Sequence, residues 1–245
     1  MNARVTVATA ARVLAQLRRD PRTIVLLLAV PPLLLTLLRY AFAHQELAFQ
    51  AVGGPLVGLF PFITMFLVTS ITMLRERTSG TLERLMTMPL AKIDILLGYA
   101  LAFAAVAIVQ TAIVCTVAIG GLGLHIEGSV LIVAGFAVLN ALLGMSLGLF
   151  VSAFAATEFQ AVQFMPAFIF PQLILCGLFA PRSTIAQPLE WLSDALPMTY
   201  AYDGLERVSA SATVSGRLLT DATVIIASSL LALALGATTL RRRTP

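Results

Sequence analysis

The sequence predicts an all-α integral membrane protein with six membrane-spanning helices and no soluble domain. Of its 245 residues, 59% are hydrophobic and only 11% are charged, whereas a soluble domain carries roughly 25% charged residues. Six apolar runs fill most of the chain, each close to the roughly 20 residues that a helix needs to cross a bilayer. So little charge cannot cover the surface of a soluble domain of this size.

The elements follow from these runs and the residues that interrupt them. Residues 1–22 hold an amphipathic helix, with Arg12 and Gln16 on one face and Leu14 and Leu17 on the other, and a basic helix of this kind lies in the headgroup plane. A single membrane domain then covers residues 23–245. Its spans are expected at residues 23–43, 51–74, 95–119, 129–151, 161–179 and 222–240.

The basic residues predict the orientation, because cytoplasmic flanks of spans are enriched in Arg and Lys. Twelve basic residues fall on one side of the six-span arrangement and four on the other, which places both termini in the cytoplasm. The twelve are Arg4, Arg12, Arg18, Arg19, Arg22, Arg75, Arg77, Arg84, Lys92, Arg241, Arg242 and Arg243. Fifteen of the sixteen basic residues are Arg and only Lys92 is Lys, and this bias, with the high Ala content, favours a GC-rich bacterial genome. The expected location is the bacterial plasma membrane.

A charged segment at about residues 78–90 separates the second and third spans. Leu82, Leu85 and Met86 recur at helical spacing, and Glu83 takes another face. A small amphipathic helix at the membrane surface can either dock a soluble partner or rest on lipid. Glu76 and Glu83 form either solvated ion pairs or contacts with the partner and the N-terminal helix.

The segment at about residues 180–220 is predicted to form two short helices that enter the outer leaflet and return. Trp191, Tyr200 and Tyr202 are mixed with acids and prolines, and aromatic rings of this kind settle at headgroup depth. An ordinary outer loop is the alternative interpretation.

Several function classes are disfavoured. The chain has no phosphate-binding loop of the G-x-x-x-x-G-K-[ST] type and no metal-ligand spacing, so we expect neither a catalytic residue nor a metal site. The basic residues flank spans rather than forming one patch, which argues against nucleic-acid binding. No span carries an acid at its centre, which argues against an ion-coupled carrier.

Two motifs are similar to those of a known family, the type-2 ABC export permeases. They are the segment from Arg75 to Leu85 followed by Pro89-Leu90, and the segment from Leu196 to Leu205. Within the family the chain is similar to the small drug-export permeases of the daunorubicin-resistance type. The resemblance implies that residues 1–22 are the connecting helix, that residues 78–90 are the coupling helix, and that residues 180–220 are the outer re-entrant hairpin.

The resemblance also implies partners: a second permease chain, identical or similar, and separate ATP-binding subunits that hold ATP and Mg, with no cofactor in this chain. Residues expected to contact the ATPase are Glu76, Gly80, Leu82, Glu83, Leu85 and Met86.

The expected function is ATP-driven export of a hydrophobic or amphipathic compound, either drug-like or a lipid. The alternative is an ATPase-independent intramembrane enzyme or assembly factor. An apolar pathway with a few polar groups suits such a substrate, and core or lipid-facing packing is the alternative for the same side chains. The candidate substrate-pathway residues are Phe60, Thr64, Phe66, Gln163, Phe164 and Phe168.

Overall fold

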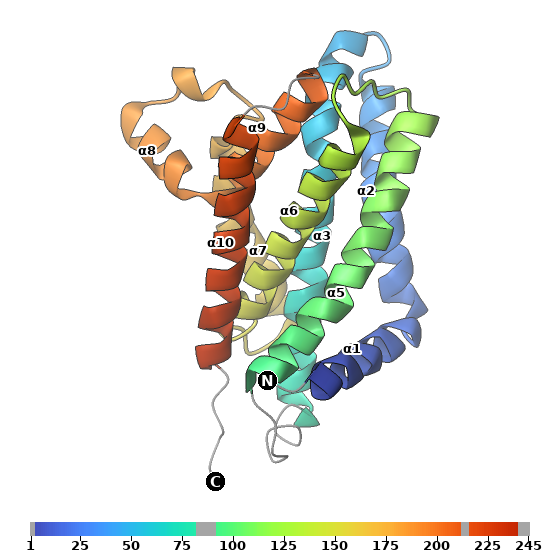
Figure 1. Cartoon of the computed structure of the whole chain (residues 1–245), viewed down its shortest axis with the longest axis vertical. Coiled ribbons are helices and arrows are strands. Elements are labelled where there is room, and N and C mark those ends of the chain that lie inside the picture. The colour runs from blue at the N-terminus through green and yellow to red at the C-terminus, as the bar shows by residue number, and fades with distance from the viewer. Residues whose placement is uncertain (1–2, 82–91, 212–215, 240–245) are drawn as a thin grey trace.

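The chain forms an elongated helical bundle (Figure 1). The computed structural model describes residues 3–81, 92–211 and 216–239, and within these ranges it contains helices and no strand. The all-α expectation is therefore confirmed for the described part of the chain.

Five helices are long and apolar enough to cross a membrane, judged by length and composition. They are α2 (Pro21–Ala41), α3 (Glu46–Thr78), α5 (Lys92–Cys115) with its π-helical continuation η1 (Thr116–Gly121), α6 (Val130–Val151) and α10 (Gly216–Thr239). They run roughly along the long axis of the molecule (Figure 1). The protein is thus a multi-pass membrane protein.

The helix α7 (Glu158–Leu175) lies beside them but is not among the five. Glu158 contacts Arg75 near the end of α3, and the Leu175 carbonyl contacts Ser193 near α9, so α7 runs between the two ends of the bundle. Its glutamines and two internal prolines lower its apolar character. The six-span count stays a prediction.

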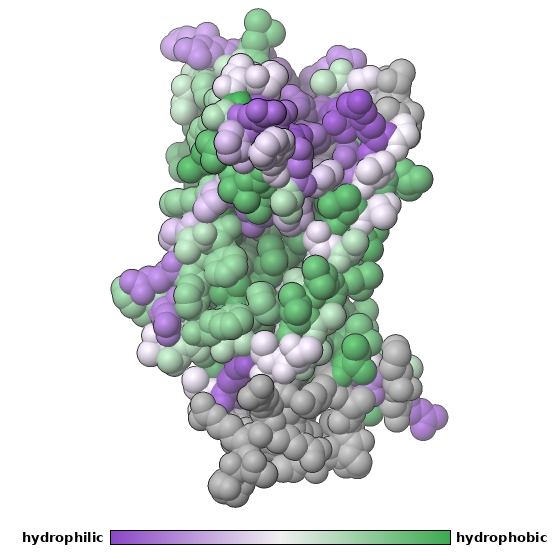
Figure 2. Space-filling model, turned by 90° about the vertical axis from the view of Figure 1, so that its left-hand side faces the viewer, coloured by the Kyte–Doolittle hydropathy of each residue, from purple (hydrophilic) through white to green (hydrophobic). Residues whose placement is uncertain are grey.

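Short helices mark the two ends of the bundle. Helix α1 (Ala3–Arg18) lies across one end, here called the α1 end, where α3 and α10 finish and α5 begins (Figure 1). At the opposite α9 end lie η2 (Arg182–Thr184), α8 (Gln187–Ala195) and α9 (Pro197–Ala210). Figure 2 shows apolar side chains across the middle of one face and polar side chains gathered toward the α9 end.

The core is built around the close packing of α3 against α6. A Cβ atom on Gly144 would lie 2.3 Å from the Phe62 carbonyl oxygen, and one on Gly148 would lie 2.2 Å from Thr69 Oγ1. Small residues let two helix backbones approach in this way. This glycine pair therefore serves packing within the chain.

A buried amide compensates for the prolines in α2. Pro31 has no N–H to donate to the carbonyl of Leu27, four residues earlier. Gln110 of α5 donates from Nε2 to that carbonyl at 2.7 Å and to Thr64 Oγ1 of α3 at 2.6 Å. Gln110 thus joins three helices at a point where α2 lacks its own hydrogen bond.

Candidate functional site

The last turn of α3 is the junction at which the α1 end is held together. Glu76 is only 4% exposed. Its carboxylate lies 3.1 and 3.4 Å from Arg12 Nη1 of α1, and Gln16 Nε2 donates to it at 3.1 Å. Arg12 Nη2 also donates to the hydroxyl oxygen of Tyr99 in α5 at 2.7 Å. We call Arg12, Gln16, Glu76 and Tyr99 the clamp.

The clamp fixes α1 through its polar face. Removing one partner of a buried ion pair leaves an uncompensated charge and costs about 3–5 kcal/mol. Arg12 and Gln16 reach Glu76 with their polar groups, while Thr9, Ala10 and Val13 are the buried residues of α1. The face of α1 that packs on the bundle therefore combines small or apolar residues with the two polar residues of the clamp.

Close packing of α1 on α5 supports the clamp. A Cβ atom on Gly98 would lie 2.5 Å from Thr9 Cβ and 3.0 Å from the carbonyl oxygen of Thr6. Only glycine allows this approach. The backbone of α1 is thus held directly against α5, one residue before Tyr99.

The end of α3 also contacts three other helices. Arg75 Nε lies 2.7 Å from Glu158 Oε1 at the start of α7, and Arg75 Nη1 lies 3.8 Å from Asp20 at the start of α2. Arg77 donates to Thr239 Oγ1 of α10 at 3.3 Å. The Arg75 pairs are exposed, so each contributes little stability on its own.

The side chain of Asp20 caps the first turn of α2. It accepts hydrogen bonds from the backbone N–H of Thr23 at 3.3 Å and from the Thr23 hydroxyl at 2.7 Å. These bonds, helped by Arg75, hold the pKa of the Asp20 carboxyl below its usual value. The start of α2 therefore carries a fixed negative charge beside the positive charge of Arg75.

A cavity of about 420 Å³ lies between α1, α2 and α3 at this end. Its lining along α3 changes from Leu67 and Ile71 to Thr72 and then to Arg75 and Ser79. These positions span 12 residues, or about 18 Å of helix. The cavity thus has an apolar part and a polar part, the order of polarity that an amphipathic molecule has along its length.

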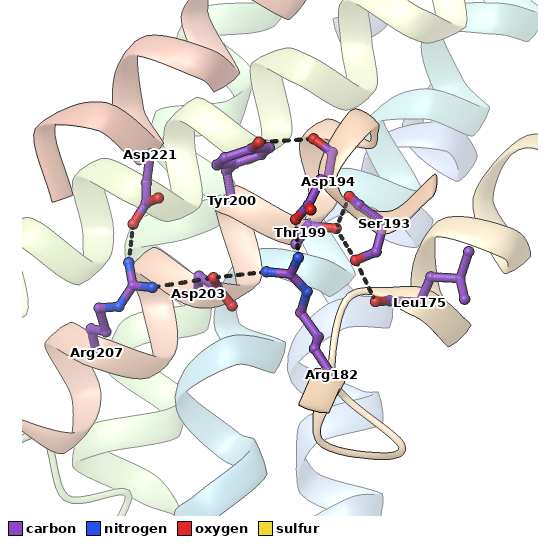
Figure 3. Close-up of polar contacts among 9 residues, drawn as sticks. All are labelled: Leu175, Arg182, Ser193, Asp194, Thr199, Tyr200, Asp203, Arg207 and Asp221. Carbon is purple, nitrogen blue, oxygen red and sulfur yellow. Dashed lines mark hydrogen bonds and ion pairs between the residues drawn. The ribbon is translucent and has the colours of Figure 1, made fainter. Parts of the chain in front are cut away.

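The α9 end is held by a chain of alternating charges (Figure 3). Arg182 pairs with Asp194 of α8 and lies 3.6 Å from Asp203 of α9, and Arg207 lies 3.2 Å from Asp203. Arg207 also pairs with Asp221 of α10. The chain therefore links α8, α9 and α10.

Hydroxyl groups extend this network to α7 (Figure 3). Ser193 Oγ donates to the Leu175 carbonyl at 2.9 Å, and Thr199 Oγ1 donates to the Ser193 carbonyl at 2.7 Å. The Tyr200 hydroxyl donates to the Asp194 carbonyl at 2.8 Å. The turn between α8 and α9 is consequently fixed relative to the end of α7.

Asp203 is the central carboxylate of this chain. Burial raises the pKa of Asp203, and the opposing effect of Arg207 and Arg182 is smaller. The ionised carboxylate is thus held in place by two arginines at a cost in desolvation.

A family model for the ABC-2 type transporter matches residues 4–208, which is most of the chain and includes the clamp and all of the α9-end network except Asp221. The chain belongs to the ABC-2 type transporter family. It is a type-2 ABC permease, as its two motifs predict.

Relatives of this permease include eukaryotic and bacterial proteins. It is 30% identical over 153 residues to ABC transporter G family member 20 of Dictyostelium discoideum, a match covering 62% of this chain and 21% of the relative. It is 29% identical over 141 residues to the probable multidrug ABC transporter permease YbhR of Escherichia coli, covering 56% and 38%. It is 27% identical over 151 residues to the E. coli inner membrane transport permease YhhJ, covering 60% and 40%. The chain therefore matches less than half the length of each relative.

The permease's predicted coupling residues divide between described and undescribed parts of the chain. Glu76 lies in the clamp, so of its two interpretations the structure shows contact with the N-terminal helix. Gly80 follows the end of α3 with φ of 71°, the left-handed conformation with which many helices end. Leu82, Glu83, Leu85 and Met86 lie outside the described residues.

The predicted substrate-pathway residues are not brought to one surface. Thr64 accepts the hydrogen bond from Gln110, and Phe66 is fully buried in the core. On α7, Gln163 and Phe168 are exposed, and the Phe164 and Phe168 rings meet edge to face with centroids 6.4 Å apart. Phe60 is half-buried on α3. Their role in transport stays a prediction.

The predicted hairpin residues differ in burial. Trp191 of α8 is 65% exposed, whereas Tyr202 of α9 is buried in the core. Helix α9 packs against α3, α6 and α10, so it is part of the bundle, while α8 lies to one side (Figure 1). Whether the pair re-enters the membrane stays a prediction.

Sequence reasoning did not assign site roles to Tyr99, Arg182 or Asp221. The role of Arg12 could have been predicted from the polar face of the N-terminal helix, because a face with Arg and Gln needs an acidic partner if it packs inward. No local pattern marks Tyr99, whose partner Arg12 lies 87 positions away.

Proposed function

We propose that this chain is the transmembrane permease subunit of an ATP-driven ABC exporter. The observation that carries the proposal is the clamp, because Glu76 joins α1, α3 and α5 directly before the segment expected to dock the ATPase. A movement of that segment is then passed to three helices at once. In this arrangement both chain termini and the segment 78–90 face the cytoplasm.

The energy source is a separate ATP-binding subunit, which would hold ATP and Mg. Leu82, Leu85 and Met86 form the apolar face that seats on it, and Gly80 sets the direction in which the segment leaves α3. A second permease chain, identical or similar, completes the transporter. The contribution of this chain is mechanical: Glu76, Arg12 and Tyr99 keep α1 and the end of α3 as one body.

The proposed substrate is a hydrophobic or amphipathic compound, either drug-like or a lipid. The cavity of about 420 Å³ between α1, α2 and α3 supports this class, since it offers an apolar wall and a polar end to one molecule. We call it the graded cavity because its wall changes from apolar to polar along α3. The multidrug wording in the name of one bacterial relative points the same way.

The test is co-purification with the cognate ATPase and substrate-stimulated ATP hydrolysis. We expect Leu82→Asp with Leu85→Asp to abolish both while leaving membrane insertion intact, because two unpaired carboxylates cannot be buried in a docking groove. Glu76→Gln should still bind the ATPase but lose most substrate stimulation, because α1 is no longer clamped to α3.

The matched control is Glu127→Gln, the same chemical change on an exposed carboxylate of the α5–α6 connection. It should leave binding and stimulation unchanged. If the Leu82 and Leu85 double variant still recruits the ATPase and transports normally, the segment is not the coupling helix. Transport without any ATPase would favour the intramembrane enzyme or assembly factor.

A further inference from the structure

A second cavity lies on the other side of α2 from the graded cavity. It has a volume of about 230 Å³ and is formed by the end of α1, the first turns of α2 and the middle of α5. This volume is below the roughly 300–1,000 Å³ of pockets for drug-sized ligands. It suits part of a single flexible chain better than a compact molecule.

The lining of this cavity is apolar apart from one residue. Leu14, Ile24, Leu28, Ala105 and Val106 are among its walls, and Arg18 at the end of α1 is its one charged member. The surface of the cavity is apolar, so the aliphatic stem of Arg18 is the part that lines it. A basic residue beside an apolar wall matches an acyl chain that carries an anionic headgroup.

The charge around Arg18 is unbalanced. Arg19 and Arg22 lie within four positions of it, all three are exposed, and none is paired with a carboxylate in the described part of the chain. The nearby Asp20 is engaged by Thr23 and lies 3.8 Å from Arg75. The corner between α1 and α2 therefore presents positive charge with no carboxylate partner among the residues that the structure describes.

Two observations thus meet at one place, an apolar groove and an uncompensated basic corner. We infer that this groove is a binding site for an anionic phospholipid, with one acyl chain against Leu28 and Val106 and the phosphate at Arg18. Basic groups beside membrane helices attract anionic headgroups in this manner. The bound lipid would hold the α1–α2 corner from outside while the clamp holds α1 from inside, which goes beyond the proposed transport function.

Fluorescence quenching by brominated lipids tests this site on the purified full chain. Trp191 is the only tryptophan, so a Trp191→Phe background with Ile108→Trp places a reporter on α5 beside the groove. The probes are phosphatidylglycerol and phosphatidylcholine with brominated acyl chains. We expect phosphatidylglycerol to quench the reporter at lower mole fraction than phosphatidylcholine.

Matched variants separate charge from shape. Arg18→Gln should weaken the phosphatidylglycerol preference about five-fold, and Arg18→Lys should keep it. Ala105→Phe should abolish it by filling the groove with no change of charge. Arg217→Gln removes an exposed arginine at the far end and should have no effect.

A second reporter excludes general enrichment of anionic lipid around the protein. Ile226→Trp on α10 is similarly exposed but far along the chain from the groove, and it should show no preference between the two lipids. Equal quenching by both lipids at the Ile108→Trp reporter, or equal preference at both reporters, overturns the site. Because no ATPase takes part, such a failure leaves the exporter proposal standing.

Discussion

Single polar side chains join neighbouring helices of this permease at mid-span. Gln110 sits at the carbonyl that Pro31 leaves free, and Asn140 of α6 donates to the Gly58 carbonyl of α3 at 3.1 Å. Interhelical hydrogen bonds by these two mid-span amides are expected from their need for partners in an apolar segment, and the structure confirms both. Their donors are used to join neighbouring helices.

Replacing Gln110 by leucine should therefore destabilise the bundle. The change removes two hydrogen bonds and leaves the Leu27 carbonyl without its side-chain donor, which we expect to cost about 1–2 kcal/mol. Thermal unfolding in lipid nanodiscs measures the loss.

The control for this change is Thr116→Val, which removes a hydroxyl that bonds only to the Ala112 carbonyl within its own helix. An unchanged transition for Gln110→Leu would contradict the role given to the amide.

At the scale of elements, α1 packs mainly on one neighbour, α5. It rests on α5 at Gly98 and is bound to α3 at Glu76. Helix α9 is the opposite case, because Met198, Ala201 and Leu205 are fully buried and its last carbonyls accept bonds from Glu127 and Gly128 backbone N–H groups. Movement of α1 is thus less costly than movement of α9.

Changing Gly98 to valine should shift α1 away from α5. The new Cβ atom alone would lie 2.5 Å from Thr9 Cβ, so the helices must separate. We expect spin labels on the exposed faces of α1 and α5 to report a longer and broader distance, together with reduced substrate stimulation of the ATPase.

The control is Gly135→Val, at a glycine of α6 with open space around its Cβ position. It should leave the label distances unchanged. If both variants behave like the parent chain, close packing at Gly98 does not fix α1.

At the scale of the whole molecule, the two ends should respond oppositely to acid. The lowered pKa of Asp20 gives stability that is present above its unfolded pKa and lost as pH falls through the folded value. The raised pKa of Asp203 gives stability that is present at low pH and lost as pH rises through the folded value.

Hydrogen exchange, corrected for intrinsic rates, measures this from about pH 7 to below the ordinary Asp pKa of about 3.9, because folded Asp20 takes up its proton only there. We expect α2 to lose protection at its first turn and α9 to gain it. Asp20→Asn and Asp203→Asn should each remove the response at one end only. A parallel response of both ends in the parent chain would show that other groups dominate.

The orientation of the molecule is also testable. Ser79 and Ser129 are exposed at opposite ends, at the end of α3 and the start of α6. In a chain with Cys115 and Cys176 changed to alanine, we expect Ser129→Cys to react with an impermeant reagent in intact cells and Ser79→Cys to react only after lysis. Reaction of both sites from outside would refute the charge-based orientation.

The apolar runs predicted the bundle well because length and hydropathy are local properties. Spans near residues 51–74, 95–119 and 129–151 correspond to α3, α5 and α6, although α3 extends through Thr78. The fifth span, expected at residues 161–179, is harder to predict from hydropathy. The helix found there, α7, begins at Glu158 and mixes glutamines and prolines with aromatic residues. The aromatic residues of α3 and α7 were grouped by type, and their separate environments depend on helix rotation, which composition does not encode.

The site was predictable only where one partner had a local signal. Glu76 stood out as an acid at the end of a span, but Tyr99 acquires its role from a partner 87 positions away. The sequence shows the polar face of the N-terminal helix, but it does not show that Arg12 on this face contacts the bundle. That contact depends on the buried carboxylate of Glu76.

The clamp has a consequence for biosynthesis. Arg12 leaves the ribosome 64 residues before Glu76 and 87 residues before Tyr99. Until α3 is inserted, the guanidinium has only water and headgroups as partners, and its contact with Tyr99 has to wait for α5, so the complete clamp forms only after both later helices are in place. A chain truncated or stalled before Tyr99 would therefore carry a basic helix whose contacts with the bundle are incomplete.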